Sequence, residues 1–204
     1  MKLVSTAGAY NMTRDDLLWA ARMIEGEGGD DAATLYAMAQ RFLFVLRPAG
    51  HRTFTSAIRA YSQPINPRWL ADGDKCAGRS TGYCDVAHTS RRAALQRAAW
   101  GELPPDKTAT VLAWSRGELP NPVPGAVDFA DASTSSDWLE HNPGARVLLR
   151  AGNWYLATAE SANRAIVQIM PGPLSVPILG GVLLAASIAG LVVGGAYLAL
   201  RWRR

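Results

Sequence analysis

Residues 13–45 read TRDDLLWAARMIEGEGGDDAATLYAMAQRFLFV, a pattern that predicts two amphipathic helices joined by a glycine-rich corner. Thr13 is a favourable N-cap residue, and Asp16 stands three positions later as the acidic partner of a capping box. The apolar residues that follow recur on one helix face. They are Leu17, Ala21 and Ile24. The first helix is therefore expected over residues 14–25, before the glycines of the corner.

The second helix is expected to begin after Asp30, because aspartate caps helix N-termini well. It should end before Pro48, which cannot continue a helix. Its apolar stripe is predicted to consist of Leu35, Met38, Phe42 and Val45. The corner between the two helices then holds two acidic residues, Glu25 and Glu27.

Shorter elements follow along the chain. Caps and apolar spacing predict helices over residues 54–61, 89–100, 107–115 and 136–140, and two short strands over 146–149 and 155–158. The fold class is therefore mainly α, an α+β domain with a small β-hairpin. We expect this domain to occupy residues 1–160, with a linker over residues 161–173.

The composition excludes a disordered chain and argues against a nucleic-acid-binding protein. Of the 204 residues, 49% are hydrophobic, which is ordinary for a globular protein. The net charge is +4, but three arginines lie within the last four residues. Residues 1–170 hold 18 basic and 17 acidic side chains, a net charge of +1. A nearly neutral domain lacks the electrostatic footprint of a phosphate-binding surface.

Residues 174–200 form a run of 27 residues without a charged side chain. As a helix this run would extend roughly 40 Å, enough to span a bilayer with some tilt. Arginines in the basic tail, residues 201–204, are typical of the cytoplasmic end of such a helix. We therefore expect a C-terminal transmembrane helix, with residues 1–170 on the side of the membrane away from the cytoplasm.

The N-terminal segment Met1–Asn11 has no apolar run of the kind found in signal peptides.

Within this predicted helix, Gly190 and Gly194 are spaced as a GxxxG motif. Such spacing permits close pairing of helices in a membrane, with a second copy of the chain or with virion proteins. Small residues are also common in transmembrane helices for no such purpose. Both interpretations remain open from the sequence.

Glu27 is the first candidate for chemistry. The unpaired carbonyl groups at the end of a helix carry partial negative charge, which disfavours a nearby carboxylate and raises its pKa. A carboxyl that stays protonated near neutral pH can donate a proton to the leaving oxygen of a glycosidic bond. The alternative is that Glu27 is simply a solvated acidic residue in a glycine-rich turn.

The surrounding residues resemble a known family. The stretch from Ala21 to Gly29, ARMIEGEGG, is similar to the Ala-Arg-x-Ile-Tyr-Gly-Glu-Ala opening of the cell wall hydrolases related to spore-cortex-lytic enzymes. Three later segments resemble family segments in the same order. They are FTSAIRAYSQP at 54–64, NPVPGAVDF at 121–129 and AGNWYL at 151–156. Glu25, Gly28, Gln40 and Trp154 replace the family's tyrosine, alanine, asparagine and histidine.

The resemblance implies a lysozyme-like fold that cuts peptidoglycan between N-acetylmuramic acid and N-acetylglucosamine, with Glu27 as the catalytic acid. A lytic transglycosylase would need this acid alone, since the 6-hydroxyl of the sugar attacks C1. A hydrolase needs a second carboxylate. Glu25 and Asp31 are candidates for it, although Asp31 also suits the first turn of a helix and neighbouring Asp30 a cap. The sequence leaves both reactions open.

Further residues are candidates for binding the substrate. Tyr61, Ser62 and Gln63 lie in the second family-like segment, and Trp154 lies in the last. Trp69 and Tyr155 are further aromatic residues that a sugar ring can stack on, although a role in the core suits each tryptophan as well.

Cys76 and Cys84 bracket a polar loop. A disulfide, two free thiols and a zinc site with Asp85 and His88 are the alternatives. The C-x7-C-x3-H spacing fits no common zinc pattern, so we expect no metal and no cofactor.

The leading hypothesis is thus a membrane-anchored muralytic enzyme, carried in a bacteriophage virion, that opens the cell wall for genome entry. A wall-remodelling enzyme of the bacterial envelope is the second. The alternative from another class is a catalytically inactive structural membrane protein of a virion or envelope complex.

Overall fold

The computed structural model describes residues 1–163 and 167–172, and these form an α+β domain. The helices are α1 (Arg14–Glu27), α2 (Asp31–Arg41), α3 (Phe54–Tyr61), α4 (Val86–Arg97), α5 (Pro105–Ser115) and α6 (Ala132–His141). The strands are β1 (Lys2–Ser5), β2 (Gly8–Asn11), β3 (Asp128–Ala130), β4 (Arg146–Ala151), β5 (Asn153–Ala157) and β6 (Gln168–Met170). They make two antiparallel sheets, ordered β2–β1–β6 and β3–β5–β4.

Helix α1 begins at the predicted capping box. The backbone N–H of Asp16 donates to the Thr13 hydroxyl over 3.2 Å, and the Asp16 carboxylate accepts from the Thr13 backbone N–H over 2.8 Å. Asp16 is buried, and its other oxygen accepts hydrogen bonds from the backbone N–H and the hydroxyl of Thr55. One side chain therefore caps α1 and joins it to the start of α3. The helix ends two residues later than predicted, at Glu27.

The second predicted helix changes type after Arg41. Asp30 caps α2 as expected, accepting from the Ala33 backbone N–H over 2.8 Å. A π-helical turn, η1 (Phe42–Leu46), then follows. Its wider winding moves the apolar face, so Leu46 is buried whereas Val45 is 45% exposed. The predicted stripe is therefore wrong at Val45.

Helix α3 spans the residues predicted for it, and the other three helices contain or overlap their predicted segments. Helix α5 starts two residues early because Pro105 occupies the first helical turn, where a missing N–H costs nothing. Both predicted strands are present as β4 and β5, which form the small hairpin.

The N-terminal sheet is formed by segments that the sequence analysis left unassigned. β1 is its central strand, flanked by β2 and by β6 from near the other end of the described chain. In the pairing of β1 with β6, Leu3 lies opposite Ile169, and Leu3 is fully buried. We expected a linker over residues 161–173, but residues 168–170 belong to the folded domain.

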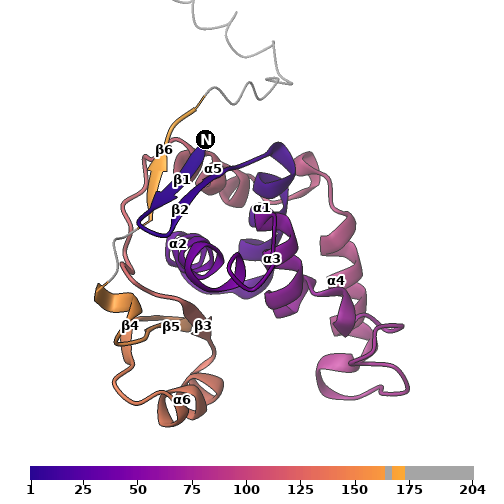
Figure 1. The fold of residues 1–204 in the computed structure, drawn as a ribbon. Coiled ribbons are helices and arrows are strands. Elements are labelled where there is room, and N and C mark those ends of the chain that lie inside the picture. Colours follow the sequence, from indigo (N-terminus) through magenta and orange to yellow (C-terminus); the bar gives the residue numbers. More distant parts are fainter. Residues whose placement is uncertain (164–166, 173–204) are drawn as a thin grey trace, which may run out of the picture. The chain divides into compact units, whose positions relative to one another are not determined.

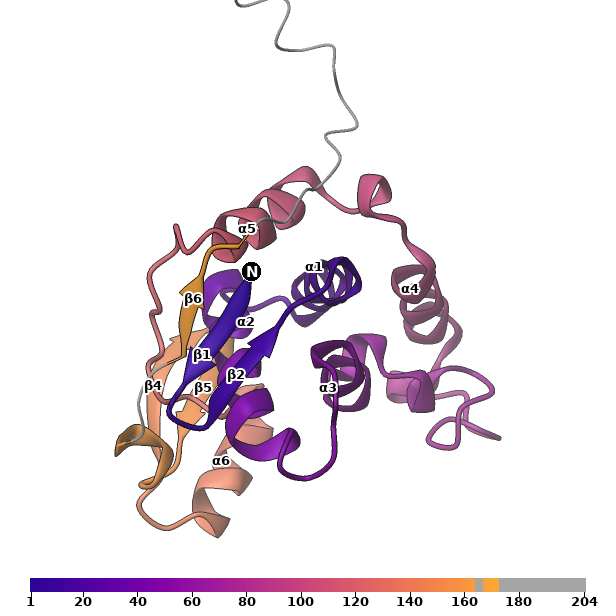
Figure 2. The ribbon, with the colours of Figure 1, turned by 45° about the horizontal axis from the view of Figure 1, so that its top comes forward.

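Helix α1 packs against α2, α3 and α5 to form the main core. The rings of Phe42, Phe54 and Trp114 meet there, with centroids 5.5 Å apart for the first two and 6.2 Å for the last two. Figures 1 and 2 show the sheet β3–β5–β4 with α6 to one side of α3, and α4 to the other side. The helical core therefore separates two smaller subregions.

The predicted transmembrane helix over residues 174–200, with Gly190 and Gly194, lies outside the described residues. Within residues 1–163 and 167–172, no helix is both long enough and apolar enough to cross a membrane.

Candidate active site

The glycine-rich corner brings the end of α1 close to two other segments. Gly28 caps α1 in the left-handed conformation, with φ of 67°, which glycine adopts at little cost. A Cβ atom on Gly26 would lie 2.5 Å from the Cβ of Pro64, so only glycine permits this approach. Pro64 belongs to a 3₁₀ turn, η2 (Gln63–Ile65). The corner thus places Glu27 beside the segment that follows α3.

Ser62 fixes the Glu27 side chain. Its hydroxyl donates to Oε1 of Glu27 over 2.7 Å, and Ser62 is buried at the C-cap of α3. Burial raises the pKa of Glu27 to about 7, against the smaller lowering effect of this hydrogen bond. The raised pKa of Glu27 was predicted from the partial charge of the helix carbonyls, whereas desolvation is its main cause. Glu27 is therefore substantially protonated near neutral pH.

Glu27 lines a cleft of about 380 Å³. Met38 and Arg41 of α2 line it too, together with Tyr61, Gln63 and Tyr83. Facing residues come from β3, from the start of α6 and from Asn153 of β5. The cleft thus collects residues from both subregions that flank the core in Figures 1 and 2.

Two further carboxylates line the cleft, and the sequence analysis named neither. Asp128 forms an ion pair with Arg41, a neighbour in the cleft. Asp131 caps α6, and hydrogen bonds from the Thr134 backbone N–H and then from the hydroxyls of Ser133 and Thr134 lower its pKa to about 2. Asp131 is therefore ionised at neutral pH. The position of Asp131 just before a helix could have predicted a capping role. Nothing local in the sequence predicts that Asp131 lines the cleft.

The predicted second carboxylates, Glu25 and Asp31, are not among the lining residues of the cleft. Asp31 is bound by Lys107, whose Nζ lies 2.9 Å from Oδ2. Glu25 precedes Glu27 by two positions on α1, a spacing that turns the two side chains toward different helix faces. Asp128 and Asp131 therefore replace them as the acidic neighbours of Glu27 across the cleft.

The predicted substrate-binding residues divide into two groups. Tyr61 and Gln63 line the cleft, and Ser62 contacts Glu27 directly. Trp154 does not line it; its ring lies under the guanidinium of Arg150, with 4.2 Å from Cζ to the ring centroid.

The alternation of side chains along β5 accounts for this difference. Asn153 lines the cleft, and its amide donates to the backbone carbonyl of Glu27 over 3.3 Å. Because successive strand residues face opposite sides, Trp154 points away. Tyr155 is buried behind the corner, where its hydroxyl donates to the Asp30 carbonyl over 3.0 Å.

Tyr83 and Phe129 are aromatic residues of the cleft that were not predicted as site residues. Tyr83 is 55% exposed. Trp69 lies beside it at a centroid separation of 6.4 Å and is not among the lining residues. Tyr83 sits one residue before Cys84, which forms a disulfide with Cys76, the first of the alternatives considered for this pair.

Gln40 holds the segment that leads into β3. It is fully buried, its amide donates to the carbonyls of Val123 and Ala126, and its Oε1 accepts from the Gly125 backbone N–H. These bonds tie the turn before β3 to α2. Asp128 is thereby placed against Arg41.

Comparison of the chain with protein-family models, curated proteins and solved structures gives no match. The described residues also contain no group of three or more potential metal ligands.

Proposed function

We propose that this chain cleaves the glycosidic bond between N-acetylmuramic acid and N-acetylglucosamine in peptidoglycan, with Glu27 as the general acid. The main support is that the Glu27 carboxyl lines a cleft and has a pKa of about 7. A carboxyl with this pKa can donate a proton at neutral pH. The resemblance of the segments around Glu27 and Ser62 to cell wall hydrolases supports the same reaction. A zymogram on purified peptidoglycan tests it.

The two other acids of the cleft favour a lytic transglycosylase over a hydrolase. Asp128 is engaged by Arg41, and Asp131 accepts three hydrogen bonds from the first turn of α6. Ion pairs and donated hydrogen bonds of this kind stabilise the charged form of a carboxylate and so make it a weaker general base. Glu27, hydrogen-bonded by Ser62, then remains as the group that transfers protons.

The proposed reaction uses Glu27 twice. Its carboxyl first donates a proton to O4 of the departing N-acetylglucosamine as the bond to C1 breaks. The resulting carboxylate then accepts the proton of the muramic acid 6-hydroxyl while that oxygen bonds to C1. Ser62 stabilises the carboxylate form through its hydrogen bond.

Digestion of sacculi should therefore release chains that end in 1,6-anhydromuramic acid. Mass spectrometry distinguishes these from hydrated ends by the mass of one water. Predominantly hydrated ends would contradict the transglycosylase and direct attention to Asp128 and Asp131 as bases. The glycosidase proposal itself would stand in that case.

We also propose that residues 174–200 anchor the enzyme in a bilayer, in a virion membrane or a bacterial envelope. A chain of residues 1–172 should remain folded and lytic but no longer sediment with vesicles. A chain of residues 1–160 should lose folding stability, because β6 is missing and one side of the central strand β1 is exposed.

Thermal unfolding measures the stability of the two truncated chains and the full chain, and vesicle sedimentation measures their binding to membranes. Sedimentation of 1–172 as strongly as the full chain would refute the anchor. Equal stability of 1–160 and 1–172 would show that β6 is dispensable.

A further inference from the structure

A second, smaller pocket adjoins the cleft. It has a volume of about 140 Å³ and shares the lining residues Gln63, Pro64 and Tyr83 with the cleft. Gly26 lines the pocket, and the next residue, Glu27, lines the cleft. A molecule bound at Glu27 can therefore extend into this pocket past Tyr83.

The two cavities differ in charge. The three acidic residues of the cleft are absent from the pocket, which is lined by His88, Arg91 and Arg92 of α4. The His88 ring pairs with the Asp85 carboxylate, with Nδ1 2.9 Å from Oδ1, so Arg91 and Arg92 supply the positive charge of the pocket. Among the described residues, no carboxylate side chain lines the pocket. The pocket therefore favours a negatively charged group.

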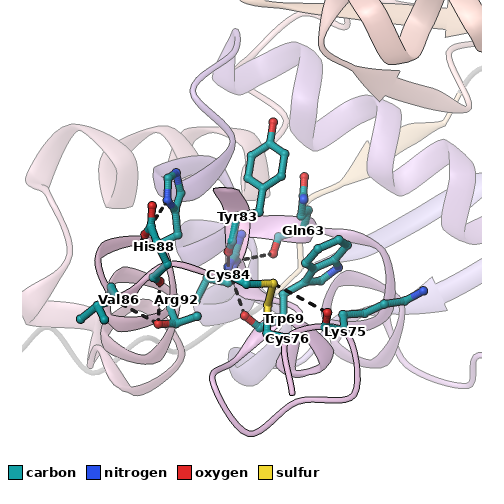
Figure 3. The surroundings of a disulfide bond; sticks show 11 residues. Gln63, Trp69, Lys75, Cys76, Tyr83, Cys84, Val86, His88 and Arg92 are labelled. Atoms are coloured by element: carbon teal, nitrogen blue, oxygen red, sulfur yellow. Dashed lines mark hydrogen bonds and ion pairs between the residues drawn. A yellow bond between two sulfur atoms is a disulfide. The ribbon is translucent and has the colours of Figure 1, made fainter. Parts of the chain in front are cut away.

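Arg92 and the disulfide hold the wall between the two cavities. Arg92 is 4% exposed, and its guanidinium donates to the backbone carbonyls of Gln63, Trp69 and Tyr83 (Figure 3). The disulfide of Cys84 closes the loop that carries Tyr83. Because two independent links fix this loop, the pocket is formed before any ligand binds.

Arg91 is the basic group available to a ligand. It is exposed, and within the described part of the chain its hydrogen bond goes to the backbone carbonyl of Glu25 over 3.3 Å. Further N–H groups of its guanidinium remain to bind a carboxylate, for which the planar fork of arginine is well suited.

We infer that this basic pocket binds the carboxylates of the peptide stem of peptidoglycan, with Arg91 as the residue that determines this specificity. The inference rests on the proposed function. The stem is attached through the lactyl group of muramic acid, the sugar whose bond is cut, and it carries free carboxylates. Its position beside the reacting bond matches the position of the pocket beside Glu27.

The test compares two soluble substrates, stem-bearing glycan chains with free carboxylates and the same chains with those groups converted to amides. Arg91→Gln should lower kcat/KM by about tenfold on the first and by less than twofold on the second. Arg97→Gln, on the same exposed helix but outside the pocket, should change neither. An equal loss on both substrates, or no loss on either, would overturn the inference.

A binding measurement separates this inference from the proposed function. Calorimetry with the Glu27→Gln chain should show that stem-bearing fragments with free carboxylates bind about tenfold more tightly than their amidated forms. Adding Arg91→Gln should remove this preference. If the wild-type chain cuts neither substrate, the proposed reaction fails, but the affinity ratio still decides the inference: equal affinities for the two fragments reject it.

Discussion

Replacing Glu27 by glutamine should lower the rate of peptidoglycan lysis by about 10²- to 10⁴-fold, because an amide cannot donate the proton that the leaving oxygen requires. The fold should persist, since glutamine has the same shape and its amide oxygen can still accept the hydrogen bond from Ser62. Lysis of purified sacculi by the wild-type and variant chains, at equal folded concentration, measures the effect.

Glu25→Gln is the matched control for this experiment. Glu25 lies on the same helix but outside the cleft, so its loss should change the rate by less than threefold or so. A larger loss of lytic rate in the Glu25→Gln chain than in the Glu27→Gln chain would show that Glu27 is not the catalytic acid. Full lysis by the Glu27→Gln chain would refute the catalytic assignment.

The second large effect is on folding stability. The pKa of Glu27 rises from 4.5 to about 7 on folding, so the folded protein binds the proton more tightly than the unfolded chain does. Stability from this group is therefore complete below pH 4.5 and is lost as the pH rises to 7. The loss amounts to as much as about 3 kcal/mol, since one pKa unit corresponds to about 1.4 kcal/mol.

Glutamine at position 27 does not ionise, so the Glu27→Gln chain should gain stability relative to wild type by this amount between pH 4.5 and pH 8. Urea unfolding of both chains across this range measures the difference, in which the other titrating groups cancel. In a chain that keeps Glu27, Ser62→Ala should enlarge the loss of folding stability between pH 4.5 and pH 8. The reason is that the hydrogen bond from Ser62 opposes the rise in the pKa of Glu27. A stability difference that is constant with pH would show that Glu27 titrates as a solvated residue.

Local signals explain which elements were predictable. The starts of α1, α2 and α3 are marked by capping side chains within three residues, so short-range interactions are sufficient to locate them. The strand β6 was missed because it pairs with β1, more than 160 residues earlier in the chain. No local pattern records such a pairing.

The sequence alone singled out Glu27, Ser62 and Gln63 as candidate site residues, since each lies in a short segment that resembles a family segment. Tertiary structure alone decided which other residues meet them. Asp128 and Tyr83 come from distant segments, and the alternation of side chains along β5 selects Asn153 instead of Trp154. The tertiary structure also determines the pKa of Glu27, because desolvation depends on all the atoms that packing brings around the carboxyl group.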